Sequence, residues 1–357
     1  MSGTSMDGLD CGLFSMSLNN QYEFNWHLID FKTFPYSNHL REEIRTSLLG
    51  DEKQIQKTHS LLGKEFAAIT TNFLQCRPVD IIASHGQTVA HIDRKSSLQI
   101  GDAKFLREAH NCPVVYNFRQ ADIDAGGNGA PLTPFLDYLV FKNTNRATIT
   151  LNLGGIANIS YIPENGKIHE VMGFDTGPAM SLIDELCQMV WGEKLDYNGN
   201  HSLQGEENAE ILSHLMQHPY LAKSPPKSTG RHSFGKNLVK QLFQKYPQVK
   251  PEDFAASFCV FTAKSIAENL EKHLNFTPSR TDLIVSGGGV HHPVIMQTIE
   301  KYISARQILT SEKVGINPDL KESLLMAVLG LCKVLDIPSN IKSVTGAKQS
   351  IVLGHFV

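Results

Sequence analysis

The sequence predicts an α/β fold arranged as two domains, and three observations support this prediction. The chain has 357 residues, which exceeds the roughly 250–300 residues at which a single hydrophobic core stops growing. Short apolar runs that are typical of buried strands alternate with segments whose apolar residues recur at helical spacing. Glycine-rich turns accompany the strands. Hydrophobic residues make up 41% of the chain, so apolar material suffices for two cores.

The charge and hydropathy patterns exclude several classes of function. The formal net charge is −3, so the basic surface of a nucleic-acid-binding protein is missing and nucleic acid is not an expected partner. The longest apolar run, Leu324 to Cys332, is far below the ~18 residues of a membrane helix, and no signal-peptide pattern opens the sequence. We therefore expect no membrane partner and a cytoplasmic location. The six scattered cysteines are expected to be reduced thiols.

The first half of the chain begins with two predicted helices. Ser37 can cap a helix that carries Leu40, Ile44 and Leu48 and stops at Gly50, since serine caps helices well and these residues share one helical face. A longer helix spans about residues 55–73. Short apolar runs then predict strands at residues 79–83, 97–100 and 113–116.

The second half repeats this alternation and suggests the domain boundary. Strands are predicted near residues 147–153, 159–162 and 282–286, and helices near residues 133–142, 178–191, 206–217, 234–246 and 252–274. We place the first domain at residues 1–135, with the last strand, 350–357, as a candidate to complete it, and the second domain at 136–349. The polar stretch 221–235 is read as a linker, a lid or a substrate loop.

Three glycine-rich turns are candidates for phosphate binding: Ser2 to Gly8, Asn152 to Asn158, and Ser286 to Val290. Glycine lets backbone N–H groups approach an anion closely, and although one such turn is usually only a turn, three separated by whole α/β units favour a nucleotide site. None matches the phosphate-loop or dinucleotide-binding patterns. We therefore predict two actin-like (ribonuclease H-like) domains with a nucleotide cleft between them.

Several longer motifs resemble one family. The opening Met1-Ser-Gly-Thr-Ser-Met-Asp-Gly-Leu-Asp10 resembles the first signature of the anhydro-N-acetylmuramic acid kinase family. Further family-like segments follow in order: Ser84 to Thr88, Gln99 to Asp102, Asn117 to Asp122, Gly126 to Leu132, Leu151 to Ile159, Gly173 to Pro178, Lys227 to Arg231 and Ser286 to Gly289.

The sequence also departs from the family pattern. Asn128 stands where many members carry Gln, Ala179-Met180 replaces a frequent Gly-Asn, and His232 replaces a frequent Glu. These departures concern fine substrate contacts and not the chemistry. Members usually have a few strand residues ahead of the first loop, so we expect a shortened first strand or a trimmed sequence.

The resemblance implies an ATP-dependent and Mg²⁺-assisted kinase. It would phosphorylate 1,6-anhydro-N-acetylmuramic acid at O6 while water opens the anhydro ring, giving N-acetylmuramic acid 6-phosphate and ADP in peptidoglycan recycling. The family assigns the general base to Asp175. Ordinary glycosidases use two carboxylates, one of which protonates the leaving oxygen. Here one carboxylate that activates water is enough, because the γ-phosphoryl group captures the leaving oxygen. The alternative is that Asp175 only caps the next helix, with Pro178 in its first turn. The resemblance also makes a homodimer plausible.

The expected binding residues divide between nucleotide and sugar. Nucleotide contacts are expected at Gly3, Thr4, Ser5, Met6, Asp7, Gly8, Gly154, Gly155, Asn158, Gly287, Gly288 and Gly289. Asp7 could hold a metal-bound water or only form a turn, and the sequence names no residue as a direct Mg²⁺ ligand. Sugar contacts are expected at Gln87, Arg119, Asp122 and Glu322. An arginine suits the lactyl carboxylate. The alternative is that Gln87, Arg119 and Asp122 are surface or domain-interface residues and that Glu322 is a solvated residue on a helix surface.

Two other functions stay open from the sequence. One is a conventional sugar kinase of the same fold, in which Asp175 deprotonates an ordinary hydroxyl group. The other is an actin-like assembly or regulatory protein without small-molecule turnover, because fold alone does not fix function. The polar residues expected on the sugar side argue against the latter.

Overall fold

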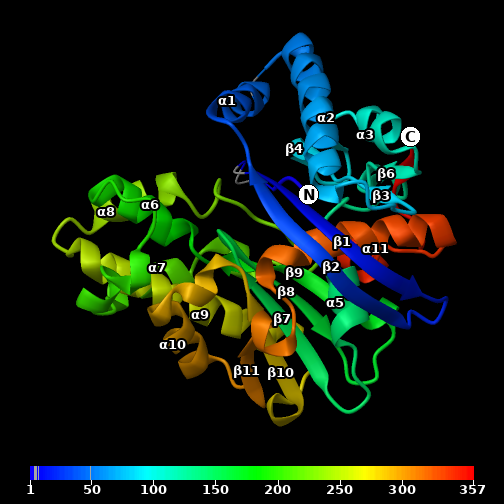
Figure 1. Cartoon of the computed structure of the whole chain (residues 1–357). Coiled ribbons are helices and arrows are strands. Elements are labelled where there is room, and N and C mark those ends of the chain that lie inside the picture. The colour runs from blue at the N-terminus through cyan, green and yellow to red at the C-terminus, as the bar shows by residue number, and fades with distance from the viewer. Residues whose placement is uncertain (4–5, 7, 49) are drawn as a thin grey trace. The chain divides into compact units, whose positions relative to one another are not determined.

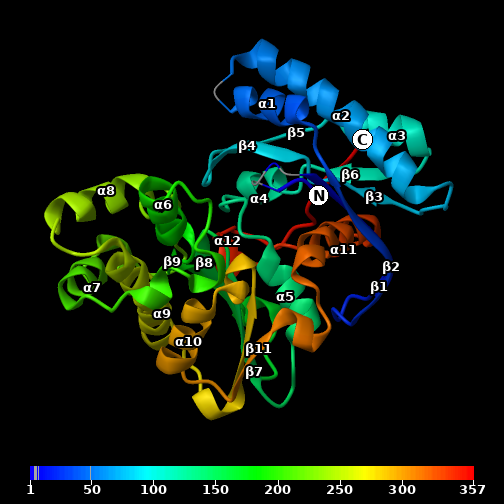
Figure 2. The same cartoon turned by 60° about the vertical axis from the view of Figure 1, so that its left-hand side comes forward.

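The computed structural model describes residues 1–3, 6, 8–48 and 50–357, with residue 319 described by its backbone only. It contains two compact units, which are drawn in Figures 1 and 2. Unit 1 comprises residues 1–140 and 319–357, and unit 2 comprises residues 141–318. The sequence assigned residues 136–349 to the second domain. The structure differs, because residues 136–140 and 319–349 lie in unit 1.

Unit 2 is built on a five-stranded mixed sheet. Its strands are β7 (Ala147–Leu153), β8 (Ile156–Ile162), β9 (Met172–Pro178), β10 (Thr281–Ser286) and β11 (Gln307–Thr310). Their order is β11-β10-β7-β8-β9, with β7 to β9 as an antiparallel meander and β10 and β11 parallel to β7. Numbered along the chain and read from β9 to β11, this is the order 3-2-1-4-5 of a ribonuclease H-like unit. The predicted α/β class is confirmed.

Helices cover the sheet of unit 2 and enclose its core. They are α6 (Ser181–Val190), α7 (Ala209–Met216), α8 (Lys236–Lys245), α9 (Pro251–His273) and α10 (Pro293–Tyr302). α9 begins with a proline, carries Glu252 and Asp253 in its first turn and ends on Lys272 and His273, so its ends match the helix dipole. Its Phe254, Phe258 and Phe261 are fully buried and join strand residues in one hydrophobic cluster.

Unit 1 opens with a long antiparallel hairpin, β1 (Gly8–Leu18) and β2 (Phe24–Pro35). α1 (Asn38–Ser47) and α2 (Glu52–Leu74) follow it. The Leu40 N–H donates to the Ser37 hydroxyl oxygen, which confirms the predicted cap. α11 (Lys321–Leu335) packs against β1 and against β3. Return of the chain after residue 318 therefore completes the core of this unit.

The remaining strands of unit 1 form two small sheets. β3 (Ile82–Ala83), β6 (Val114–Tyr116) and β12 (His355–Phe356) make one, and β4 (Gln87–Ile92) pairs with β5 (Ser96–Ile100) in the other. The short helices are α3 (Lys104–His110), α4 (Gln120–Asp124), α5 (Thr133–Phe141) and α12 (Lys342–Thr345). Within the described part of unit 1, β1 and β3 are not hydrogen-bonded, and a cavity of about 440 Å³ lies between them. The strands of unit 1 are therefore divided among separate small sheets, whereas the five strands of unit 2 form one continuous sheet.

Among the helices of the described residues, none combines the length and the apolar character that crossing a membrane requires.

Candidate active site

A row of polar side chains crosses four strands of unit 2. Ser286 of β10, Asn152 of β7, Asn158 of β8 and Asp175 of β9 are successive partners in the register of the sheet. Partners in register share one face of a sheet, so these four side chains lie on the same side. Their neighbours Leu151, Leu153, Ile159 and Phe174 are buried in the hydrophobic cluster on the other side. The predicted residues Asn158 and Asp175 thus lie together, and the sequence had not assigned Asn152 or Ser286.

Asp175 is held by a segment distant in sequence. Its backbone N–H donates to the Lys227 carbonyl (3.2 Å), and the Thr229 N–H donates to its carboxylate Oδ2 (2.9 Å). The Tyr220 hydroxyl donates to the Asp175 carbonyl (2.7 Å). Backbone and side chain are therefore both fixed, which is what a general base needs in order to meet one proton of a bound reactant.

The helix-cap reading of Asp175 is wrong. The strand β9 continues to Pro178, and α6 begins only at Ser181, with Met180 at its cap position and no side-chain cap. Pro178 accordingly lies in a strand and not in the first turn of the helix. The Asp-Thr-Gly-Pro pattern resembles a helix start, but in the structure pairing with β8 extends the strand through it.

The glycine hairpin between β7 and β8 is fixed against the start of α6. The Gly154 carbonyl accepts from the Met180 N–H, and the Gly155 carbonyl accepts from the N–H groups of Ala179 and Ser181, each at 3.0 Å. These bonds tie the hairpin to the end of β9. The hairpin and Asp175 are thus parts of one bonded arrangement.

The third predicted loop, Gly287 to Gly289, packs on the end of β7. Gly287 has φ +86°, and a Cβ there would lie 2.5 Å from Asn152 Oδ1. A Cβ on Gly289 would lie 2.6 Å from Leu153 Cβ. Only glycine allows this close approach. Within unit 2 the structure therefore brings together the predicted Gly154, Gly155, Asn158, Asp175 and the loop 287–289.

The first predicted loop belongs to unit 1. Thr4, Ser5 and Asp7 lie outside the described residues. The Met6 N–H donates to the Gly3 carbonyl (3.2 Å), and Met6 has φ +54°. Gly8 begins β1, and a Cβ there would lie 2.5 Å from the Phe34 carbonyl oxygen. This glycine lets β2 approach, and the phosphate contact of the loop stays a prediction.

Two of the predicted sugar contacts are occupied by internal partners. Gln87 is fully buried and accepts from the Ser2 hydroxyl (2.6 Å). Asp122 is also fully buried, and its carboxylate accepts from Gly129 N–H (2.8 Å), Asn340 Nδ2 (3.0 Å) and Thr345 Oγ1 (2.8 Å). Both side chains organise loops of unit 1. Their contact with a sugar stays a prediction.

Arg119 is oriented by two acceptors. Its Nη1 donates to the Gly129 carbonyl (2.9 Å) and its Nε to His85 Nε2 (3.2 Å), while His85 Nδ1 faces the Gly86 carbonyl (3.0 Å). This pattern assigns the proton to Nδ1 of a neutral imidazole. Burial, helped by the Arg119 cation, lowers the pKa of His85 to about 3.

Glu322 lies in the first turn of α11 and interacts electrostatically with Arg119. Burial raises the pKa of Glu322, while the positive charges of the chain terminus and Arg119 oppose that rise. Burial likewise lowers the pKa of Arg119, and Glu322 opposes this change. The two predicted sugar residues Arg119, which is partly buried, and Glu322, which is exposed, therefore interact electrostatically within unit 1.

Sequence reasoning gave no role to Lys227. This side chain is only 8% exposed, its Nζ donates to the Lys223 carbonyl (2.9 Å), and it lies over the rings of Tyr220 and Phe174. Burial lowers the pKa of Lys227 to about 8. The Lys-Ser-Thr-Gly-Arg motif was the available signal. Lys227 anchors the segment that holds Asp175.

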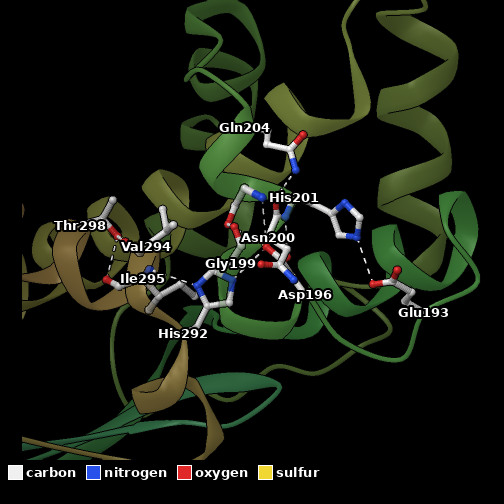
Figure 3. A network of polar contacts seen from close by, with 11 residues as sticks. Glu193, Asp196, Gly199, Asn200, His201, Gln204, His292, Val294, Ile295 and Thr298 are labelled. Carbon is white, nitrogen blue, oxygen red and sulfur yellow. Dashed lines mark hydrogen bonds and ion pairs between the residues drawn. The ribbon is translucent and has the colours of Figure 1, made fainter.

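A second buried network in unit 2 is structural (Figure 3). The Asp196 carboxylate accepts from the Ser202 hydroxyl (2.7 Å) and from His292 Nε2 (3.1 Å), and the Ile295 N–H donates to His292 Nδ1 (3.3 Å). Burial alone would raise the pKa of Asp196, but its hydrogen bonds, led by that from His292, lower it to about 2. The network ties the segment 196–202 to the start of α10.

The family model and the curated relatives that match this chain all carry the same family name. The family model described as anhydro-N-acetylmuramic acid kinase matches residues 1–357. Curated relatives of that name come from Clostridioides difficile (36% identical) and Francisella tularensis subsp. novicida (37%), each over 99% of this chain and 96% of the relative. A relative of the same name from Bacillus cereus is 34% identical over 99% of this chain and 97% of the relative.

Proposed function

The chain belongs to the anhydro-N-acetylmuramic acid kinase family and is therefore a kinase, and we propose that it uses ATP to phosphorylate O6 of 1,6-anhydro-N-acetylmuramic acid while water opens the anhydro ring. The products are N-acetylmuramic acid 6-phosphate and ADP, as peptidoglycan recycling requires. One observation carries this proposal above the others. Asp175 is fixed on β9 beside Asn158 and beside the glycine hairpin 154–155.

The residues present in unit 2 fit the phosphates of ATP. The hairpin 154–155 and the loop 287–289 bring glycine backbone to the end of the polar row, and backbone N–H groups of this kind are suited to phosphate oxygens. When bound, Mg²⁺ would neutralise charge on the β- and γ-phosphates. The side-chain oxygen of Asn158 is a ligand of the type that Mg²⁺ prefers.

Asp175 acts on water in this proposal. It takes a proton from the water whose oxygen bonds to the anomeric carbon. The bond between that carbon and O6 breaks, O6 bonds to the γ-phosphorus, and ADP leaves. Thr229 holds one carboxylate oxygen at 2.9 Å, so the direction of the carboxylate is set before the reaction starts. Arg119 and Glu322 are proposed to bind the sugar, with the guanidinium on the lactyl carboxylate.

Product analysis tests the proposal directly. The protein is incubated with Mg-ATP and 1,6-anhydro-N-acetylmuramic acid, and the products are analysed by mass spectrometry and by a reducing-sugar assay. A phosphorylated and reducing product supports the kinase with ring opening. A phosphorylated but non-reducing product would replace it with a conventional sugar kinase, in which Asp175 deprotonates a hydroxyl group. Absence of any sugar product would refute both.

A further inference from the structure

The guanidinium of Arg231 lies beside the glycine hairpin of unit 2. A Cβ on Gly155 would lie 3.5, 3.6 and 3.8 Å from Nη2, Nε and Cζ of Arg231. These distances place the Nη2/Nε edge of the guanidinium beside Gly155, at ordinary van der Waals distance from the position that a Cβ would take. A Cβ at residue 155 would fit beside the guanidinium without a clash, so the contact shows where the cation lies and does not itself require glycine.

Two carboxylates of α6 hold this cation. Nη1 donates to Glu185 Oε1 (3.1 Å) and Nη2 to Asp184 Oδ2 (3.3 Å). The Arg231 side chain is 55% exposed, whereas those of Asp184 and Glu185 are 15% and 22% exposed. Arginine has five N–H donors, and these bonds use two. The arrangement therefore fixes the guanidinium and leaves N–H groups on a half-exposed face.

Asp184 is an unusual partner for a surface arginine. Its Oδ1 is buried and has no hydrogen-bond partner among the described residues. Burial raises the pKa of Asp184 to about 6, although Arg231 lowers it. Leaving a buried acceptor unpaired costs free energy. A purely structural ion pair would be expected to satisfy this oxygen.

The backbone of the turn that carries Arg231 is fixed by hydrogen bonds and close packing, and the same segment contacts Asp175. The N–H groups of Ser233 and Phe234 donate to the Gly230 carbonyl, both at 3.0 Å. A Cβ on Gly235 would lie 2.3 Å from the Arg231 carbonyl oxygen. Two residues earlier, Thr229 holds the Asp175 carboxylate. One short segment thus positions both a cation beside the hairpin and the proposed base.

We propose that Arg231 binds a phosphate oxygen of the nucleotide at the hairpin 154–155, and that Asp184 and Glu185 hold its guanidinium beside the hairpin until the nucleotide arrives. The proposal rests on the proposed function and adds a nucleotide-binding residue to that site. A guanidinium can donate two parallel hydrogen bonds to a phosphate group. It would also offset negative charge that develops during phosphoryl transfer.

The same guanidinium chemistry would suit a carboxylate of the sugar. We assign the phosphate because Arg231 lies beside a glycine hairpin whose neighbours are the polar row and the loop 287–289. The experiment separates the two sources of negative charge by comparing ATP with two sugars. One is 1,6-anhydro-N-acetylmuramic acid, and the other is 1,6-anhydro-N-acetylglucosamine, which lacks the lactyl carboxylate.

The test compares Arg231→Met with Arg231→Lys and with the control Arg280→Met. Arg280 is 60% exposed, pairs with Glu164 and donates to the Asn145 carbonyl. It therefore makes a similar surface ion pair, but at the ends of β7 and β8 opposite the hairpin. Isothermal titration calorimetry measures the Kd for ATP and each sugar, and calorimetric melting without ligand gives Tm. We expect Arg231→Met to raise the Kd for ATP at least about 10-fold, Arg231→Lys to restore part of the loss, and Arg280→Met to leave it unchanged.

Other outcomes would overturn the assignment. If Arg231→Met lowered Tm more than Arg280→Met but left the Kd for ATP unchanged, the ion pair would be structural only. If only the muramic sugar bound more weakly, Arg231 would bind the lactyl carboxylate. Binding of ATP is measured without turnover. A wild-type protein that bound ATP through Arg231 but made no phosphosugar would therefore contradict the proposed function alone.

Discussion

At the scale of single residues, the position of the proposed base depends on chain far from it in sequence. Lys227 and Thr229 bond to Asp175 through their own backbone groups, much as a neighbouring strand would. Lys227 is in turn held by Lys223 and by two aromatic rings. The stretch 221–235, which the sequence left open as linker, lid or substrate loop, therefore includes residues that support Asp175.

Asp175→Asn tests the proposed base. The amide keeps the size of the side chain but cannot accept the proton from water, so turnover should fall at least ~10²-fold. Binding of ATP and sugar, measured by calorimetry, should persist. In ¹⁸O-labelled water the wild-type protein should place solvent oxygen on the anomeric carbon. Label in the phosphate, or near-normal turnover by the variant, would remove Asp175 from the mechanism.

Thr229→Pro tests the hydrogen bond that orients this carboxylate. Proline has no N–H, so the bond to Asp175 Oδ2 is lost and kcat should fall about 10-fold, with smaller changes in KM for either substrate. Thr229→Ala is the matched control, because it keeps the N–H. The Thr229 hydroxyl has no hydrogen-bond partner within the described residues, so alanine should retain activity. Equal loss in both variants, with equal loss of Tm, would indicate a folding defect instead.

At the scale of helices and strands, the sequence was most informative where one face of an element is strongly apolar. Helices α2 and α9 and strand β7 lie where apolar spacing placed them. The hairpin β1–β2 was not predicted, because β2 is exposed along much of its length and its polar residues weaken the alternating pattern. Strand β9 was mistaken for a helix start, since only its pairing with β8 reveals the strand.

The network around Asp196 predicts an acid-dependent loss of stability in unit 2. The pKa of Asp196 is lowered to about 2 in the folded protein, below its ordinary value of about 3.9. Its ionised form therefore stabilises the fold above about pH 4, and this contribution disappears as the pH falls toward 2. Urea unfolding of the wild-type protein should show a falling midpoint over that window.

Asp196→Asn should be less stable than wild type at pH 7 and should lose less stability between pH 4 and pH 2. Asp336→Asn is the control, because this residue is exposed. The control should follow the wild-type curve. A wild-type slope retained in Asp196→Asn would show that other carboxylates cause the acid sensitivity.

At the scale of the whole molecule, the chain leaves unit 1 after residue 140 and returns to it at residue 319. The sequence singled out Glu322 but could not reveal which core its helix, α11, joins. Contacts between distant segments decide this: β12 pairs with β6, and Asn340 and Thr345 donate to Asp122.

The candidate site also depends on contacts between segments that are distant in sequence. Motifs identified the glycines and Asp175, whereas the contact of Arg231 with Asp184, 47 residues apart, appears in no local pattern.

A matched pair of core substitutions tests this division of the chain. Leu353, near the C-terminus, and Leu283, in β10, are both fully buried, and cutting either to alanine should cost about 2–5 kcal/mol. Leu353→Ala should speed amide hydrogen exchange in β6 and α11, because its segment packs on unit 1 through Ser339 and Val115. Leu283→Ala should instead speed exchange in β7 and β11, the two strands that flank β10. If Leu353→Ala opened β7 as much as β6, residues 319–357 would stabilise both units equally and the assignment of this segment to unit 1 would fail.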